Sequence, residues 1–257
     1  MKQVMWVELK NLFTLIEQSN KIVFFGGAGV STASGIPDFR SVDGLYSQKY
    51  DYPPEVILSR SFFWNNTQEF YKFYYDKMIY QNVKPNYCHL ALAYLEKRGK
   101  LSAVVTQNID GLHQLAGSKK VLELHGSVHR NYSVNTNRFY DLDYIINNRV
   151  DGIPLTEDGE LIKPDVVLYE EALNQDILRE SIDVISRADL LIIGGTSLTV
   201  YPASGLVHYF RGNNIVIINK SKIYSEGANQ INLDINEVFR QYLEFKGEEL
   251  WNIWKDF

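Results

Sequence analysis

Five short apolar runs of the sequence each end in residues that could bind a ligand or take part in catalysis. Glycines follow the first run, carboxamide and carboxylate side chains the second, an imidazole the third, and hydroxyl or amide side chains the last two. Glycine-rich backbone and hydroxyl groups suit phosphate binding, whereas an imidazole suits proton transfer. The five tips are Gly26-Gly27-Ala28-Gly29, Thr106-Gln107-Asn108-Ile109-Asp110, His125-Gly126-Ser127, Gly194-Gly195-Thr196-Ser197 and Asn219-Lys220-Ser221.

Two of these tips suggest a specific chemistry. Gly27-Ala28-Gly29 follows a strand, and glycines there would let the backbone approach a diphosphate, although Thr32 stands where the third glycine of the dinucleotide motif belongs. A plain tight turn is the alternative for this segment. His125 is a candidate general base because a free imidazole has a pKa near ~6.5 and accepts a proton at neutral pH. A hydrogen-bonded surface histidine is the alternative for that residue.

The elements that carry these tips read as an α/β fold. Unbroken apolar runs such as 22–25 and 190–193 are typical of strands buried on both faces of a parallel sheet. Helical patterns over 87–98 and 175–187 separate the runs, and an amphipathic helix is expected at the N-terminus, with its apolar face formed by Trp6, Leu9, Phe13 and Ile16. We therefore predict a doubly wound, Rossmann-like parallel sheet with its ligand site at the carboxyl ends of the strands.

Two segments do not follow this alternation of strand and helix. Residues 39–82 are rich in aromatic side chains, and residues 128–163 are polar and prone to turns. We expect these two segments to form a smaller inserted lobe, a helical insert plus a second module. The Rossmann-like domain would then consist of residues 1–38, 83–127 and 164–257.

Composition excludes several classes of protein. The chain has 257 residues, 45% of them hydrophobic and 22% charged, which is ordinary for a globular domain. The formal net charge of −5 argues against general nucleic-acid binding, and no apolar run reaches the ~20 residues of a membrane span. A single cysteine, Cys88, excludes an internal disulfide and a cysteine-rich metal site. We expect a cytoplasmic protein without a membrane or nucleic-acid partner.

Longer motifs around the same tips carry a family resemblance. The segment 26–41 resembles the signature loop of the sirtuins, the NAD-dependent protein deacylases of the Sir2 family. The segments 107–113, 125–127 and 195–203 resemble three further blocks of that family, and 164–171 resembles its substrate-binding segment. The matches occur in family order and extend from about residue 20 to residue 235.

The resemblance implies roles for individual residues. His125 would be the general base, with Asn108 and Asp110 around the nicotinamide and its ribose. Val166, Val167 and Leu168 would bind the acyl-lysine of a protein or peptide. NAD would contact Gly27, Ala28, Gly29, Ser31, Thr32, Asp38, Phe39, Arg40, Gln107, Asn108, Ile109, Asp110, His125, Gly195, Thr196, Ser197, Asn219, Asp234 and Ile235.

The implied activity is NAD-dependent removal of an acetyl group from lysine, which yields nicotinamide, O-acetyl-ADP-ribose and free lysine. Transfer of ADP-ribose to a protein is the alternative, and a third possibility is a regulatory module that senses NAD. Family members that remove succinyl groups carry a Tyr-x-x-Arg pair, where this chain has Tyr71 and Tyr74. We therefore expect a neutral acyl group, with Lys72 as a conceivable substitute cation.

The chain departs from the family at its structural zinc site. Typical sirtuins place two cysteine pairs in the smaller lobe, where this sequence has Ser133 and Thr136, then Thr156 and Gly159. Hydroxyl groups and glycine cannot replace thiolates in a tetrahedral zinc site. We predict that the protein holds no zinc or other metal, and that aromatic packing stabilises the lobe.

Overall fold

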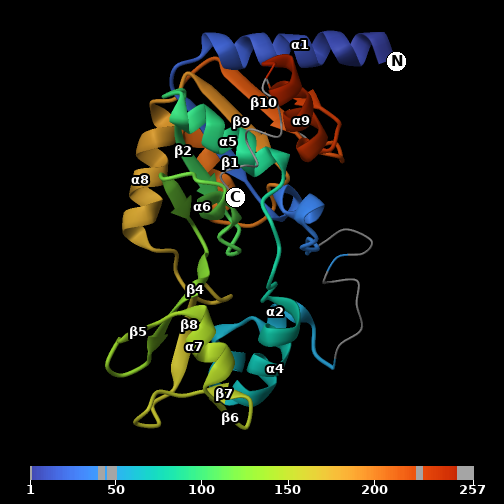
Figure 1. Cartoon of the computed structure of the whole chain (residues 1–257). Helices are drawn as coiled ribbons and strands as arrows, with labels where there is room; N and C mark the ends of the chain where they lie inside the picture. The colour runs from blue at the N-terminus through green and yellow to red at the C-terminus, as the bar shows by residue number, and fades with distance from the viewer. Residues whose placement is uncertain (1, 40–43, 45–50, 224–227, 248–257) are drawn as a thin grey trace.

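The larger lobe is built on a parallel sheet. The structure is a computed structural model, and it describes residues 2–39, 44, 51–223 and 228–247 (Figure 1). Within these residues the strands follow the order β11-β10-β9-β1-β2-β3, and every neighbouring pair is parallel. The doubly wound α/β fold predicted from the sequence is confirmed. The strands are β1 (Ile22–Gly26), β2 (Leu101–Thr106), β3 (Val121–Glu123), β9 (Leu190–Gly194), β10 (Asn214–Ile218) and β11 (Asn229–Ile231).

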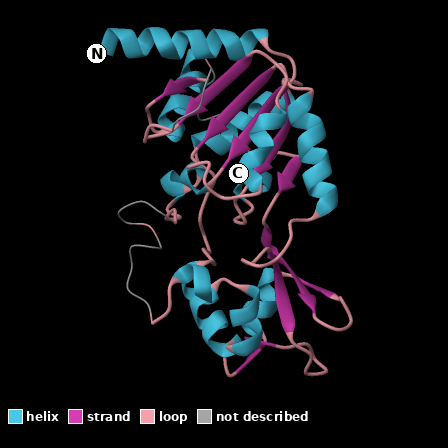
Figure 2. Cartoon of the chain, turned by 180° about the vertical axis from the view of Figure 1, so that it is seen from behind, coloured by secondary structure: helices cyan, strands magenta, loops and turns pink. Residues whose placement is uncertain are grey.

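Helices cover both faces of this sheet (Figure 2). One face packs against α1 (Lys2–Gln18), α5 (Tyr87–Lys97) and α9 (Ile235–Phe245), and the other against α8 (Gln175–Ser186) and the 3-10 helix η4 (Ala203–Tyr209). In β1, Phe24 lies in the first cluster and Phe25 on the opposite face. Both faces are therefore buried, which is why the strand sequences are uninterrupted apolar runs.

The N-terminal helix differs from its prediction at one position. Leu9, Phe13 and Ile16 are buried against the sheet as expected, but Trp6 is 45% exposed. The first turns of α1 extend past the edge of the sheet (Figure 1), and Lys10 lies over the Trp6 ring, with its Nζ 5.4 Å from the ring centroid. The prediction that Trp6 belongs to the buried apolar face is therefore wrong. The sequence shows the periodicity of the helix, but it does not show how much of the helix packs on the sheet.

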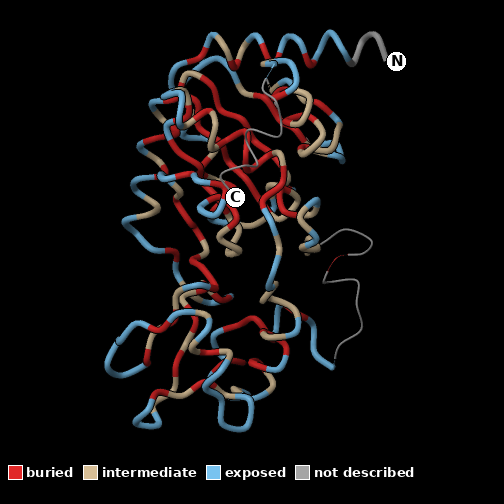
Figure 3. Tube along the Cα trace, viewed as in Figure 1, coloured by how far each residue is buried: buried red, intermediate tan, exposed pale blue. Residues whose placement is uncertain are grey.

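The smaller lobe has its own core. Strand β4 (Gly126–Ser133) pairs antiparallel with β5 (Phe139–Tyr140) and β8 (Ile162–Val166), and β6 (Arg149–Val150) pairs with β7 (Ile153–Pro154). Four helices belong to the described part of this lobe: α2 (Pro54–Ile57), α3 (Arg60–Asn65), α4 (Thr67–Lys77) and α7 (Leu142–Asn147). Figure 3 shows buried positions running through both lobes. A cluster of aromatic side chains fills the core of the smaller one, including Phe63, Phe70, Tyr71 and Tyr74.

Strands β4 and β8 join the lobes. Arg130 on β4 forms ion pairs with Glu123 at the end of β3 (2.6 Å) and with Asp165 on β8 (2.8 Å). The residue limits proposed for the two lobes stay a prediction. Among the described helices, none combines the length and apolar character that a membrane crossing requires.

Candidate active site

The glycine loop after β1 lies directly on the tip of β9. It forms two 3-10 turns, η1 (Ala28–Val30) and η2 (Thr32–Ser34), and the Gly29 N–H donates to the Gly195 carbonyl oxygen at 2.8 Å. A Cβ added at Gly29 would lie 2.9 Å from the Gly195 Cα, and one added at Gly27 would lie 2.9 Å from the Thr196 Cβ. The two glycines are therefore needed for contact between two loops of the protein itself, besides any approach of a diphosphate.

A hydrogen-bonded network joins the tips of β1 and β2. The Ser31 hydroxyl donates to Asp110 Oδ2 at 2.6 Å and accepts from Asn108 Nδ2 at 3.1 Å. Ser31 is 1% exposed, so these bonds lie below the surface of the site. Three residues predicted to contact NAD are thus in direct contact with one another, although Ser31 and Asn108 are 77 positions apart in the sequence.

Asp110 is held at both carboxylate oxygens. Oδ1 accepts from the N–H of Leu112, which begins helix α6 (Leu112–Leu115), and the Asp110 carbonyl oxygen lies 3.1 Å from His129 Nε2. Burial raises the pKa of Asp110, and the hydrogen bonds from Ser31 and Leu112 oppose that shift because they stabilise the ionised form. The arrangement gives an ionisable acceptor of fixed orientation at the tip of β2.

The geometry around His125 selects one tautomer. Its Nδ1 lies 3.0 Å from the Gln107 carbonyl oxygen, an acceptor only, so Nδ1 carries the proton. Nε2 is then the basic atom of the ring. Burial lowers the pKa of His125, and the bond to Gln107 opposes this shift. The imidazole is therefore neutral at physiological pH and able to accept a proton at Nε2.

The predicted substrate segment runs directly beside His125. The Val167 N–H donates to the His125 carbonyl oxygen at 3.0 Å, and Val166 pairs with Gly126 between β8 and β4. Val166 and Leu168 are 6% and 3% exposed and pack in the smaller lobe, whereas Val167 is half-buried. Of the three side chains, Val167 is the one with surface available to a ligand.

Asp38 and Phe39, both predicted to contact NAD, lie in the segment that leads into the smaller lobe. Phe39 is half-buried against the aromatic core of that lobe, and Ile109 packs against the same cluster. Asp38, next to Phe39, is half-buried as well. Arg40, predicted to contact the cofactor, lies outside the described residues.

The tip of β9 connects to that of β2. Gln107 Nε2 donates to Thr196 Oγ1 at 3.1 Å, and the same hydroxyl oxygen accepts from the Leu198 N–H at 3.2 Å. Ser197 is exposed, and its hydroxyl lies 2.7 Å from that of Thr199. The Thr196 hydroxyl is thus already hydrogen-bonded within the protein, and the Ser197 hydroxyl is more accessible to a ligand.

The residues predicted to contact NAD at the end of β10 and the start of α9 are Asn219, Asp234 and Ile235. The polar side chains among them already bind other groups of the protein. Asn219 Nδ2 donates to the carbonyl and hydroxyl oxygens of Ser221, at 3.1 and 3.0 Å. Asp234 caps α9 and forms an ion pair with Lys220 at 2.8 Å. Ile235 is 4% exposed in the core beneath the sheet, so contact with a nucleotide would involve its backbone.

Hydrogen bonds connect the residues that stand where typical sirtuins have their zinc-binding cysteines. Ser133 Oγ lies 2.6 Å from Thr136 Oγ1, and Glu160 accepts from the Thr136 N–H and hydroxyl, both at 2.8 Å. Thr156 Oγ1 accepts from the Glu160 N–H at 2.9 Å. These donors do not fit zinc, and the described residues contain no group of three or more His, Cys, Asp or Glu side chains placed to hold a metal ion.

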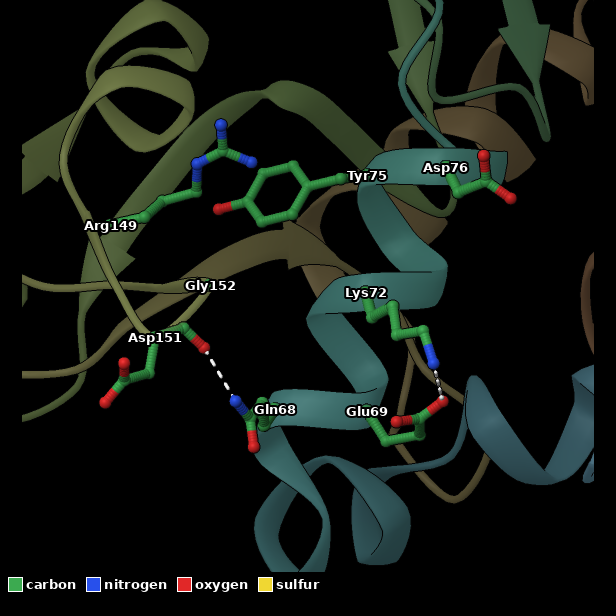
Figure 4. A pocket seen from close by; sticks show the side chains of 8 residues that line it. All are labelled: Gln68, Glu69, Lys72, Tyr75, Asp76, Arg149, Asp151 and Gly152. Carbon is green, nitrogen blue, oxygen red and sulfur yellow. Dashed lines mark hydrogen bonds and ion pairs between the residues drawn. The ribbon is translucent and has the colours of Figure 1, made fainter.

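A cavity of about 680 Å³ opens on the smaller lobe between α4 and the segment 149–152. Figure 4 shows the side chains that line it. Lys72 faces this cavity and pairs with Glu69 at 3.2 Å, with 75% of its side chain exposed. Tyr71 and Tyr74, on the other side of α4, are fully buried, and the Tyr71 hydroxyl donates to the Ile162 carbonyl oxygen. Lys72 is thus directed away from the aromatic core next to the substrate segment.

Sequence reasoning gave no individual role to three residues around the site. His129 contacts the Asp110 backbone, Ser127 Oγ accepts from the His129 N–H at 3.2 Å, and Asn86 contacts the glycine loop. Ser127 follows His125 in the same motif, so its position was a signal. Asn86 directly precedes a predicted helix, so the sequence indicates only an ordinary N-cap there.

Comparisons with known proteins show the family to which the chain is similar. Residues 27–202 match the model of the Sir2 family. The chain is 59% identical over 215 residues to an NAD-dependent protein deacetylase of Clostridium tetani, covering 82% of this chain and 87% of that protein. It is 52% identical to one of Clostridium acetobutylicum, covering 92% and 97%.

Solved structures show the same fold. Sir2 with a p53 peptide and NAD+ is 40% identical to this chain, with a TM-score of 0.82 over 93% of this chain and 98% of the other. Sir2 bound to an acetylated peptide is 39% identical, with a TM-score of 0.82 over 94% and 99%. The family match covers more than half of the sequence, and the relatives align over nearly their whole length. The chain belongs to the Sir2 family.

Proposed function

We propose that this protein is an NAD-dependent protein-lysine deacetylase that releases nicotinamide, O-acetyl-ADP-ribose and deacetylated lysine. The observation that carries the proposal is the group at the strand tips. His125, with a basic Nε2, stands beside a loop in which Ser31 orients Asn108 and Asp110. A relative that is 59% identical to this chain is named an NAD-dependent protein deacetylase.

Each group of the site has a task in this reaction. Asp110, an oriented acceptor, would hold the carboxamide of nicotinamide, and the glycine loop would bind the diphosphate. After nicotinamide leaves and the acyl oxygen bonds to ribose C1′, His125 Nε2 would remove the proton from a ribose hydroxyl, which attacks the acyl carbon. The lysine amine would then leave that carbon, and water would add to it to give O-acetyl-ADP-ribose. Positioning and electrostatic stabilisation would supply most of the acceleration.

We propose acetyl-lysine in proteins or peptides as the substrate, with other neutral acyl groups accepted. The direction of Lys72, toward solvent and Glu69, supports this choice because its ammonium group does not lie beside the buried Tyr71 and Tyr74. The extended segment at Val167 supports recognition of the peptide backbone by addition of a strand.

We further propose that the protein works without zinc, in the cytoplasm and without nucleic-acid or membrane partners. The hydroxyl and carboxylate network at Ser133, Thr136 and Glu160 supports the first point, because it satisfies the turn that zinc would otherwise organise. The single cysteine and the net charge of −5 support the others.

The decisive experiment is mass spectrometry of the purified protein incubated with NAD and an acetyl-lysine peptide. We expect deacetylated peptide, nicotinamide and O-acetyl-ADP-ribose in equal amounts, with no reaction in the His125→Ala variant. The variant His208→Ala is the matched control, since His208 lies in η4, outside the proposed site. Nicotinamide release without peptide change, or protein that gains the mass of ADP-ribose, would favour the transferase alternative.

A further inference from the structure

Asn86 links the start of α5 to the glycine loop. Its side-chain amide donates to the Val30 carbonyl oxygen at 2.7 Å and to the Ser34 hydroxyl at 3.0 Å. These two acceptors belong to η1 and η2, the turns that carry the residues expected to contact NAD. Asn86 is 7% exposed, so water does not readily replace either bond.

The same residue also caps the helix. Asn86 Oδ1 accepts from the Cys88 N–H at 3.0 Å, and the Asn86 N–H donates to His89 Nδ1 at 3.2 Å. The cap uses the carbonyl half of the side chain, whereas the loop contacts use the NH₂ half. A substitution that keeps an oxygen acceptor and removes the NH₂ group therefore separates the two tasks.

We infer that Asn86 is a positioning residue for NAD binding, an inference that rests on the proposed function. The Val30 carbonyl belongs to the peptide bond whose N–H is that of Ser31, so the tether fixes the backbone from which the Ser31 hydroxyl reaches Asp110 and Asn108. Val30 is fully buried, and α5 is anchored in the core of the larger lobe. Asn86 thus transmits the position of a rigid helix to the cofactor loop.

The test uses Asn86→Asp and Asn86→Ser in the full-length protein. Aspartate and serine are both good N-caps, but neither ionised aspartate nor the shorter serine can donate to the two loop acceptors in the present geometry. We expect the KM for NAD and the Kd for NAD measured by calorimetry to rise about tenfold in both variants, as two hydrogen bonds to the loop are lost. The KM for the peptide should stay unchanged, whereas the Tm without NAD should fall by a similar amount in both variants, because the buried Val30 carbonyl oxygen loses a hydrogen-bond donor.

Two further variants define the origin of the effect. Asn174→Asp alters the N-cap of α8, where Asn174 Oδ1 accepts from the Asp176 and Ile177 N–H groups, and should leave the KM for NAD unchanged. Ser34→Ala removes one acceptor and should weaken NAD binding less than Asn86→Ser does. It should add little in the Asn86→Ser background, because the bond that it removes is already lost.

The possible outcomes separate this inference from the proposed function. An unchanged Kd for NAD in both Asn86 variants would overturn the inference, and so would equal losses of NAD and peptide affinity, which would indicate a general defect of the fold. If the wild-type protein binds NAD but does not deacetylate the peptide, the proposed function fails, while the calorimetric comparison still tests Asn86.

Discussion

The bond between Ser31 and Asp110 gives the sharpest test of the nicotinamide end of the site. Replacing Ser31 with alanine removes a 2.6 Å bond to the carboxylate, while the Leu112 N–H still donates to the other oxygen. A hydrogen bond to a charged group contributes about 1.5–3 kcal/mol, and we expect the lower part of this range because one donor persists. About 1.5–2 kcal/mol corresponds to a loss of roughly 12- to 30-fold in kcat/KM for NAD.

The same substitution should change the pH dependence. Burial already raises the pKa of Asp110 above its usual value of 3.8, and the Ser31 hydroxyl holds it down by stabilising the ionised form. Without that hydroxyl the pKa of Asp110 rises further, because the ionised carboxylate loses one of its two hydrogen-bond donors. If the ionised carboxylate binds nicotinamide, the acid limb that belongs to Asp110 in the kcat/KM profile for NAD moves to higher pH.

The assay is steady-state deacetylation of an acetyl-lysine peptide with varied NAD across acid to neutral pH. Ser181→Ala is the matched control, because Ser181 is fully buried in α8 and no hydrogen-bond partner for its hydroxyl lies among the described residues. That variant should keep the wild-type kinetics. Wild-type kcat/KM and an unshifted acid limb in Ser31→Ala would refute the assigned role of the Ser31–Asp110 bond.

Three further predictions test other parts of the site. Because burial lowers the pKa of His125, the acid limb that reports this base should lie below the ~6.5 of free imidazole, and a limb above that value would contradict a neutral buried ring. Gly126→Ala should lower the Tm and abolish activity, because the added Cβ would lie 1.8 Å from the Asp165 carbonyl oxygen. The control Gly152→Ala has a similar positive φ but no heavy atom within 4 Å of the added Cβ, so its free energy of unfolding should fall by only about 1–2 kcal/mol and its activity should persist. Glu160→Gln should lower the Tm with little change in kcat, because Glu160 accepts hydrogen bonds from Thr136. A chelator should change neither the Tm nor the kcat of the wild type. Inactivation by a chelator and recovery with zinc would overturn the prediction that the protein holds no zinc.

The strands and their tips could be predicted because burial on both faces leaves a direct mark on the sequence. The run 190–193 is apolar throughout, and its end marks the point where the chain leaves the core. Strand β11 (Asn229–Ile231) was missed because it is short and lies at an edge of the sheet, with Ile231 its only buried residue. A strand of this kind forms through pairing with β10, which local sequence does not reveal.

For the candidate site, the sequence suggested residues but not the contacts among them. The motifs suggested Ser31, Asn108 and Asp110, and the fold then shows that one hydroxyl bridges the other two side chains. Asn86 left the ordinary signal of a helix cap, and its second task depends on a loop 52 to 56 residues earlier in the chain. Such long-range bonds depend on tertiary packing, which propensity and spacing do not encode.

The two ends of the proposed NAD site differ in how far the protein has organised them in advance. At the diphosphate and the nicotinamide, the bond from the Gly29 N–H to the Gly195 carbonyl oxygen and the bonds of Ser31 fix the loop without a ligand, which reduces the ordering cost of binding. At the adenosine end, Asp234 is engaged by Lys220, so a nucleotide that used this carboxylate would have to displace an ion pair. An exposed pair of this kind contributes little stability and is readily exchanged. Binding energy would therefore depend mainly on the rigid loop, which is the part that Asn86 supports.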